Sequence, residues 1–136
     1  MKDLDQAIAR LAEQEYTCVL CRGDVCYTAN ERGVKPLLDW LEEGVDLRGF
    51  AAADKVVGRG AAFLYVLLGV SAVWGRVMSE PARAVLQQHG IEMAAQQVVP
   101  AIRNRDGSGF CPIESAVLEM DDPQKALQAI QEKIKK

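Results

Sequence analysis

A cysteine at the expected start of a helix is the clearest candidate nucleophile in the sequence. Cys111 lies between a glycine-rich loop and a helix that we expect to begin at Pro112. Backbone N–H groups and the helix dipole lower the pKa of a thiol at such a place, and the thiolate is the nucleophilic form. Glu80 or Asp54 would then carry the proton. The alternative is a buried or half-buried thiol that only packs, because the charges flanking Cys111 have opposing effects on its pKa.

The loop before Cys111 is the clearest candidate for a ligand-binding loop. Asn104, Arg105 and Asp106 are followed by Gly-Ser-Gly. Side chains of these types beside a helix N-terminus can hold an anion or a carboxamide. The same residues also build tight turns, so a turn without a ligand is the alternative.

Two polar pairs stand where the sequence predicts a helix after a strand. Asp54 and Lys55 precede an apolar run from Val56 to Leu68, and Ser79 and Glu80 precede a second helix. As a binding pair, Lys55 would face an anionic group of a ligand and Asp54 a donor. Glu80 beside a ligand could act as a general acid or base. The alternative is that Asp54 and Ser79 are ordinary helix caps.

Three further cysteines fall in a predicted β-hairpin. Gly23-Asp24 suits a two-residue type II′ loop. The register pairs Arg22 with Val25, Cys21 with Cys26 and Leu20 with Tyr27. Cys18 and Cys21 have C-x-x-C spacing but should point to opposite faces of the strand, which argues against a metal site. Cys21 and Cys26 lie within disulfide reach, and we expect them to remain thiols in a reducing cytoplasm.

Composition narrows the class of protein. The 136 residues include 16 Lys plus Arg and 19 Asp plus Glu, a net charge of −3, and 49% are hydrophobic. This is typical of one globular domain over residues 1–136, and it disfavours binding to nucleic acid polymers. The charged first residues do not resemble a signal peptide, and the uncharged stretch at 61–75 is too short to span a membrane. We therefore expect a cytoplasmic protein without a membrane segment.

The order of predicted elements indicates the architecture. Helices are expected at 3–14, 35–43, 56–68, between Ser79 and Gly90, at 112–120 and at 123–135; strands are expected in the hairpin at 16–28, at 50–53, at 71–78 and within 91–99. Strands that alternate with helices favour a three-layer α/β fold, with helices on both faces of a mixed sheet. Ligands of such sheets usually bind beyond the carboxyl ends of strands, where helices begin.

Several short segments resemble a known family. ERGVKPLL (31–38), ADKVVG (53–58), SEPA (79–82), HGI (89–91) and NRDGSGFCPIE (104–114) are similar to the family called domain of unknown function 1893. The resemblance covers residues 16–125, with residues 1–14 as a preceding helix, and it implies a cytidine-deaminase-like fold. Deaminases hold zinc with H-x-E and P-C-x-x-C at two helix starts, which here read Asp54-Lys55 and Ser79-Glu80-Pro81. We therefore expect no zinc site and no cofactor.

These observations combine into one leading hypothesis with two alternatives. The leading hypothesis is a deaminase-like domain that binds a small polar ligand, such as a nucleotide or related metabolite, between the two helix starts and the loop at 104–111. The first alternative is an enzyme that uses Cys111 as a covalent nucleophile. The second is a non-catalytic domain that acts through a protein partner or as a homo-oligomer, with the apolar helix after Val56 against a neighbour.

Overall fold

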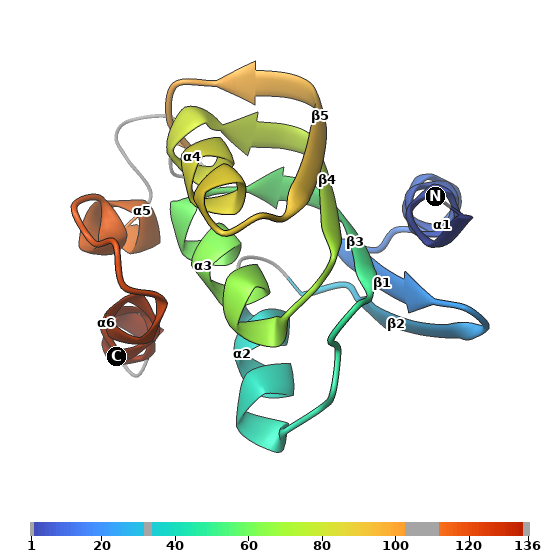
Figure 1. Cartoon of the computed structure of the whole chain (residues 1–136), viewed down its shortest axis with the longest axis horizontal. Coiled ribbons are helices and arrows are strands. Elements are labelled where there is room, and N and C mark those ends of the chain that lie inside the picture. The colour runs from blue at the N-terminus through green and yellow to red at the C-terminus, as the bar shows by residue number, and fades with distance from the viewer. Residues whose placement is uncertain (1, 32–33, 103–111, 135–136) are drawn as a thin grey trace.

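The computed structural model of the chain describes residues 2–31, 34–102 and 112–134 (Figure 1). Its elements are α1 (Lys2–Glu13), β1 (Cys18–Arg22), β2 (Val25–Ala29), α2 (Lys35–Glu43), β3 (Ala51–Val57), α3 (Arg59–Leu68), β4 (Ala72–Ser79), α4 (Glu80–Gln88), β5 (Glu92–Val99), α5 (Pro112–Val117) and α6 (Pro123–Ile134).

The strands form one mixed sheet between two helical layers. Their order is β2-β1-β3-β4-β5; β1 is antiparallel to both β2 and β3, and β3, β4 and β5 run parallel. Helix α1 covers one face of the sheet, α2, α3 and α4 cover the other, and α5 and α6 pack outside α3 (Figure 1). The predicted three-layer α/β architecture with a mixed sheet is confirmed. In the described part of the chain, no helix has the length and apolar character needed to cross a bilayer.

The β1–β2 hairpin has the predicted register. Gly23 takes the left-handed φ of 58° that the two-residue loop requires, and Cys21 stands directly opposite Cys26. Cys18 lies in the core under α3, whereas Cys21 lies in the cluster under α1, so the two point to opposite faces as expected. The expectation that Cys21 and Cys26 remain thiols is not met, because the structure joins them in a disulfide with a Cα–Cα distance of 4.2 Å.

Strand β3 extends further than predicted, and this changes the setting of Asp54. The predicted strand ended at Ala53, with Asp54 as the cap of the next helix; both predictions are wrong. Asp54 lies inside β3 and registers with Gly75 of β4. The β-branched pair Val56 and Val57 continues the pairing with β4, as their β propensity favours.

Helix α3 therefore begins at Arg59, three residues later than predicted, and Gly58 is its N-cap. Its apolar side chains are covered by the chain itself, because α2, α4, α5 and α6 all pack against it. Phe63, Leu64 and Tyr65 are almost fully buried. The expected cover of an all-round apolar helix thus comes from within the protein.

Helix α4 follows the prediction. Ser79 Oγ accepts a hydrogen bond from Ala82 N at 3.1 Å, Pro81 lies in the first turn, and His89 ends the helix before Gly90 takes a φ of 73°. Helix α2 likewise ends at Gly44. Helix α5 stops at Val117 rather than at the predicted residue 120.

Candidate functional site

A buried carboxyl–phenol pair joins the sheet to α3. Asp54 points from β3 towards α3, where the Tyr65 hydroxyl donates a hydrogen bond of 2.6 Å to its Oδ2. The other oxygen, Oδ1, accepts from Val56 N at 3.3 Å. Tyr65 has no solvent exposure, whereas Asp54 as a whole residue is half-buried. A carboxyl group therefore stands at the border of an otherwise apolar core.

The surroundings of this pair raise the pKa values of both side chains. Burial raises the pKa of Asp54 from 3.8 to about 7, although hydrogen bonds from Tyr65 and from the backbone of Val56 and Lys55 act in the opposite direction. Burial also raises the pKa of the Tyr65 hydroxyl well above its ordinary value, and the Asp54 charge adds to that shift. Near neutral pH, Asp54 is thus present both as an acid and as a carboxylate, while Tyr65 remains a hydrogen-bond donor.

Cys18 completes the cluster from β1. It is the cross-strand partner of Asp54 and is 3% exposed. Burial, followed by the Asp54 charge, raises the pKa of the Cys18 thiol well above 9.0. A neutral thiol is a poor nucleophile. Cys18 therefore packs beside the carboxyl group and is not activated as a nucleophile.

Lys55 does not join Asp54. Successive residues of a strand point to opposite faces, so the Lys55 side chain leaves β3 on the face that carries α1. Its backbone N–H is bound to Thr17 O at 3.0 Å and anchors β3 to the segment before β1. The two side chains predicted as a binding pair are therefore separated by the sheet.

Ser79 and Glu80 lie at the junction of β4 and α4, away from both Asp54 and Lys55. Asp54 registers with Gly75, and Ser79 follows four residues later, roughly 13 Å further along β4. The Ser79 side chain is fully buried and its hydroxyl caps α4, while Glu80 is exposed and bonds Arg83 at 3.1 Å. Of the predicted site residues that the structure describes, Asp54 and Lys55 point to opposite faces of the sheet, and Ser79 and Glu80 are chain neighbours at the start of α4, away from both. Asn104, Arg105, Asp106 and Cys111 lie outside the described residues.

The sheet edge where α3 begins is closed by a carboxylate that sequence reasoning did not place there. Glu114 of α5 is 8% exposed, and its two oxygens accept hydrogen bonds from Arg59 N at 2.8 Å and Gly60 N at 2.9 Å. These free N–H groups at a helix start would otherwise attract an anion. Gly58 is necessary for this contact, because a Cβ there would lie 2.6 Å from Glu114 Cδ. The protein's own carboxylate thus fills the anion position of α3.

The Arg59 side chain connects the start of α3 to α4, to α5 and to the segment after α5. Its guanidinium group donates to the carbonyl oxygens of Val117 at the end of α5, of Met120 after that helix and of Pro81 in α4. It also lies 5.1 Å from the centre of the Phe63 ring. The side chain is 11% exposed. Glycines on both sides of Arg59, inside a predicted helix, were the sequence signal that this helix begins later.

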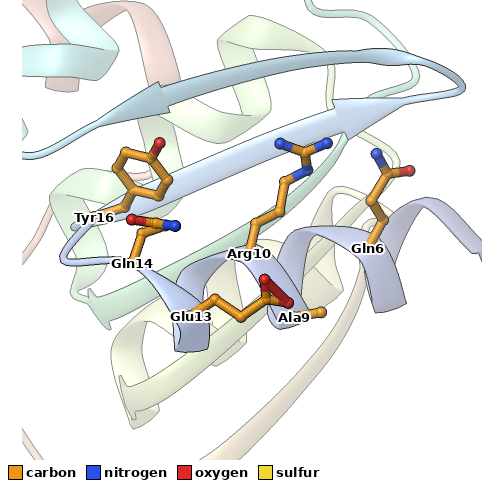
Figure 2. Close-up of a pocket in the computed structure, with 6 residues that line it drawn as sticks. All are labelled: Gln6, Ala9, Arg10, Glu13, Gln14 and Tyr16. Atoms are coloured by element: carbon orange, nitrogen blue, oxygen red, sulfur yellow. The ribbon is translucent and has the colours of Figure 1, made fainter.

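A groove of about 350 Å³ lies along α1 (Figure 2). The sheet separates it from the Asp54 carboxyl group, which faces α3. Its lining residues are Gln6, Ala9, Arg10, Glu13, Gln14 and Tyr16. Arg10 projects towards the hairpin, and Gln6 and Tyr16 stand at opposite ends (Figure 2). Among the described residues, no group of three or more His, Cys, Asp and Glu side chains is placed to hold a metal ion.

Comparisons with known proteins place the chain in a family. The model of the family described as Domain of unknown function (DUF1893) matches residues 6–134. The chain belongs to this family. The crystal structure of a DUF1893 family protein (TM1506) from Thermotoga maritima is similar with a TM-score of 0.90 and 25% sequence identity, over 97% of this chain and 90% of that chain. No curated protein matches. The family resemblance in the sequence segments is thereby confirmed.

The DUF1893 match spans the polar centres described above. Asp54, Tyr65, Arg59 and Glu114 all lie within residues 6–134. The family description names no activity, and a fold alone does not determine a function, so the polar centres are the best guide to what this DUF1893 chain does.

Proposed function

We propose that this DUF1893 domain binds a small polar ligand through the carboxyl group of Asp54, which Tyr65 holds in place. The observation that carries the proposal is the 2.6 Å hydrogen bond between a fully buried phenol and the carboxyl group of Asp54, a residue that is only half-buried as a whole. A desolvated carboxylate costs stability unless it is well paired, and such costs gather at functional sites. Apolar packing between β3 and α3 does not by itself require a carboxyl group at this position.

The chemistry of Asp54 indicates the class of ligand. Each carboxyl oxygen has two acceptor positions, and Tyr65 and Val56 N use one position on each oxygen. A carboxyl group that is partly protonated near neutral pH both donates and accepts hydrogen bonds. Its complement is a ligand edge with an N–H donor beside a carbonyl or ring nitrogen, as in a nucleobase or a carboxamide. The resemblance to the cytidine deaminase fold supports the same class, a nucleotide or related metabolite.

The other hypotheses from the sequence remain predictions. An enzyme with Cys111 as nucleophile and Glu80 as proton carrier depends on a loop outside the described residues. Lys55, Ser79, Asn104, Arg105 and Asp106 also remain proposed ligand contacts, although the described ones do not lie beside Asp54. A non-catalytic partner-binding or self-associating domain is the third hypothesis, and a cytoplasmic location also remains a prediction.

The test is ligand binding by three matched proteins. Thermal shift and calorimetry would screen cytosine, adenine, nicotinamide and their nucleotides against wild type, Asp54→Asn and Asp54→Leu. Wild type should bind at least one compound, with an affinity that changes around neutral pH. Asp54→Asn keeps a donor and an acceptor, so it should bind without that pH dependence. Asp54→Leu should lose binding.

The controls separate a lost site from a lost fold. Asp46→Asn removes a carboxylate that is exposed and paired with Arg48, so it should bind as wild type does. Circular dichroism and urea unfolding would show that each variant folds. Equal binding by wild type and Asp54→Leu would contradict the proposal. The proposal would also be contradicted if no compound of the panel binds and if wild type has the same mass under native and denaturing conditions, which means that it carries no ligand from the cell.

A further inference from the structure

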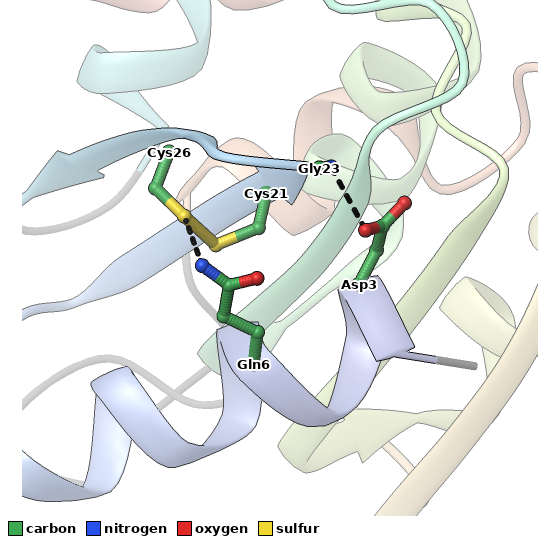
Figure 3. Close-up of a disulfide and its surroundings, with 5 residues drawn as sticks. All are labelled: Asp3, Gln6, Cys21, Gly23 and Cys26. Carbon is green, nitrogen blue, oxygen red and sulfur yellow. Dashed lines mark hydrogen bonds between the residues drawn. A yellow bond between two sulfur atoms is a disulfide. The ribbon is translucent and has the colours of Figure 1, made fainter.

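The Cys21–Cys26 disulfide lies directly under α1. The two cysteines are a cross-strand pair of β1 and β2, on the sheet face that α1 covers (Figure 3). Cys21 is fully buried in the same apolar cluster as Ala7 and Leu11 of α1. Cys26 is half-buried, so it is the more accessible residue of the two.

Helix α1 contacts the hairpin by hydrogen bonds at two points around this disulfide. Gln6 Nε2 donates to Cys26 Sγ at 3.3 Å, and the Asp3 carboxylate accepts from Gly23 N in the hairpin loop at 2.9 Å (Figure 3). One contact involves the disulfide sulfur itself, and the other involves the turn that the disulfide closes. Both contacts therefore connect α1 to the part of the hairpin that the disulfide closes.

The same contact reaches the groove along α1. Gln6 lines the groove of about 350 Å³ and also bonds Cys26 Sγ. A change at the sulfur that moves the Gln6 amide changes the groove lining as well. This groove is separated by the sheet from the Asp54 carboxyl group, so the inference does not depend on the ligand-binding proposal.

We propose that Cys21 and Cys26 form a reversible thiol–disulfide site, and that its oxidised form fastens α1 to the β1–β2 hairpin and sets the shape of the groove. Disulfides in reducing compartments are usually transient or redox-sensing rather than structural. A cross-strand pair in register can also hold two thiols without a change of strand pairing. Both states are thus compatible with the sheet.

The oxidation balances with a hydroperoxide as oxidant. The more accessible Cys26 thiolate attacks the peroxide oxygen, which gives a sulfenic acid and an alcohol. The Cys21 sulfur then attacks the Cys26 sulfur and displaces hydroxide, which leaves as water after taking the Cys21 proton. Two thiols and one hydroperoxide thus give one disulfide, one alcohol and one water.

The reduction balances with a dithiol. A thiolate of the reductant attacks Cys26 Sγ and releases Cys21 as a thiolate, which takes up a proton. The second thiol of the reductant then attacks the reductant sulfur in the mixed disulfide and releases Cys26. The reductant leaves as a disulfide, and the protein gains two electrons and two protons.

The test measures thiols and hydrogen exchange on the full chain in both states. After treatment with a dithiol, maleimide added on denaturation should label Cys21 and Cys26, because Cys21 is buried in the folded chain, and prior treatment with a hydroperoxide should abolish that labelling. Loss of the Gln6 contact should increase amide exchange in α1 about fivefold on reduction, with little change in α6. Cys18→Ala is the matched control, because Cys18 faces the opposite side of the sheet. It should respond as wild type does.

A variant without the disulfide completes the test. Cys21→Ala/Cys26→Ala should show the faster α1 exchange under both oxidising and reducing conditions. Cys26→Ser, at the half-buried position, is the substitute if the double variant does not fold. The proposal is overturned if hydroperoxide leaves Cys21 and Cys26 open to labelling, or if α1 exchanges equally in oxidised and reduced wild type.

Discussion

Tyr65 of α3 donates its hydroxyl hydrogen to Oδ2 of Asp54 in β3, at 2.6 Å. The contact joins a helix and a strand whose other facing residues are apolar, among them Ala52 and Leu64. It places a hydrogen bond to an ionisable carboxyl group within an otherwise apolar layer. The account of function and several measurable properties of the protein depend on this pair.

The stability of the protein should fall as pH rises through neutrality. The pKa of Asp54 is about 7 in the folded chain and near 3.8 when the chain is unfolded, so the folded state binds more protons between these values. The stabilising contribution is complete below about pH 4 and is lost as pH passes about 7, a change of about 2–4 kcal/mol. Urea unfolding across this range would measure it. In Asp54→Asn this component should vanish, whereas Asp46→Asn should retain it because Asp46 titrates at about 2.

Removal of the Tyr65 hydroxyl should raise the pKa of Asp54 above its wild-type value. The hydrogen bond from Tyr65 favours the ionised carboxylate, so Tyr65→Phe removes that support. We expect a loss of about 1–3 kcal/mol in unfolding free energy, larger at alkaline than at acid pH. Tyr27→Phe is the control, since the Tyr27 ring packs edge-on against Trp40 and Phe50. Equal pH profiles for the two variants would show that the Tyr65 hydroxyl does not support the carboxylate.

Glu114→Ala should destabilise the protein by about 2–3 kcal/mol, because it leaves the N–H groups of Arg59 and Gly60 without their acceptor in a mostly buried place. Hydrogen exchange should locate the effect at the start of α3 and in α5. Glu119→Ala, at an exposed position beyond α5, should change stability by less than about 0.5 kcal/mol. A loss no larger than that of Glu119→Ala would mean that water replaces the carboxylate without cost.

Gly58→Ala should cost about 1–3 kcal/mol by steric conflict rather than by backbone strain. The added Cβ would lie 2.6 Å from Glu114 Cδ, while the Gly58 φ of −96° suits any residue. Unfolding of the double variant with Glu114→Ala tests this cause. Since the conflicting side chain is then absent, Gly58→Ala should add little to Glu114→Ala alone. Additive losses would place the conflict elsewhere.

Local sequence patterns predicted the elements that local physics determines. The Gly23-Asp24 loop set the hairpin register, and Ser79 with Pro81 marked the start of α4. The start of α3 was misplaced because Asp54 has the residue type of a cap. Its carboxyl instead bonds Val56 N two residues on, while β3 continues beside β4.

The polar centres could not be predicted in the same way because they are non-local. Asp54 meets Tyr65 only after α3 packs on the sheet, and Glu114 caps a helix 55 residues earlier in the chain. No periodicity or cap signal links such positions. Sequence reasoning selected Asp54 as a candidate site residue, but for a helix start that it does not occupy.

The most direct test of the account is an NMR titration of the Asp54 carboxyl carbon in ¹³C-labelled protein, with Asp54→Asn to assign the signal. We predict a midpoint near 7, shifted upwards in Tyr65→Phe. A midpoint near the ordinary value of about 4 for an aspartate would contradict the account, because Asp54 would then be a plain carboxylate at neutral pH without the capacity to donate a hydrogen bond.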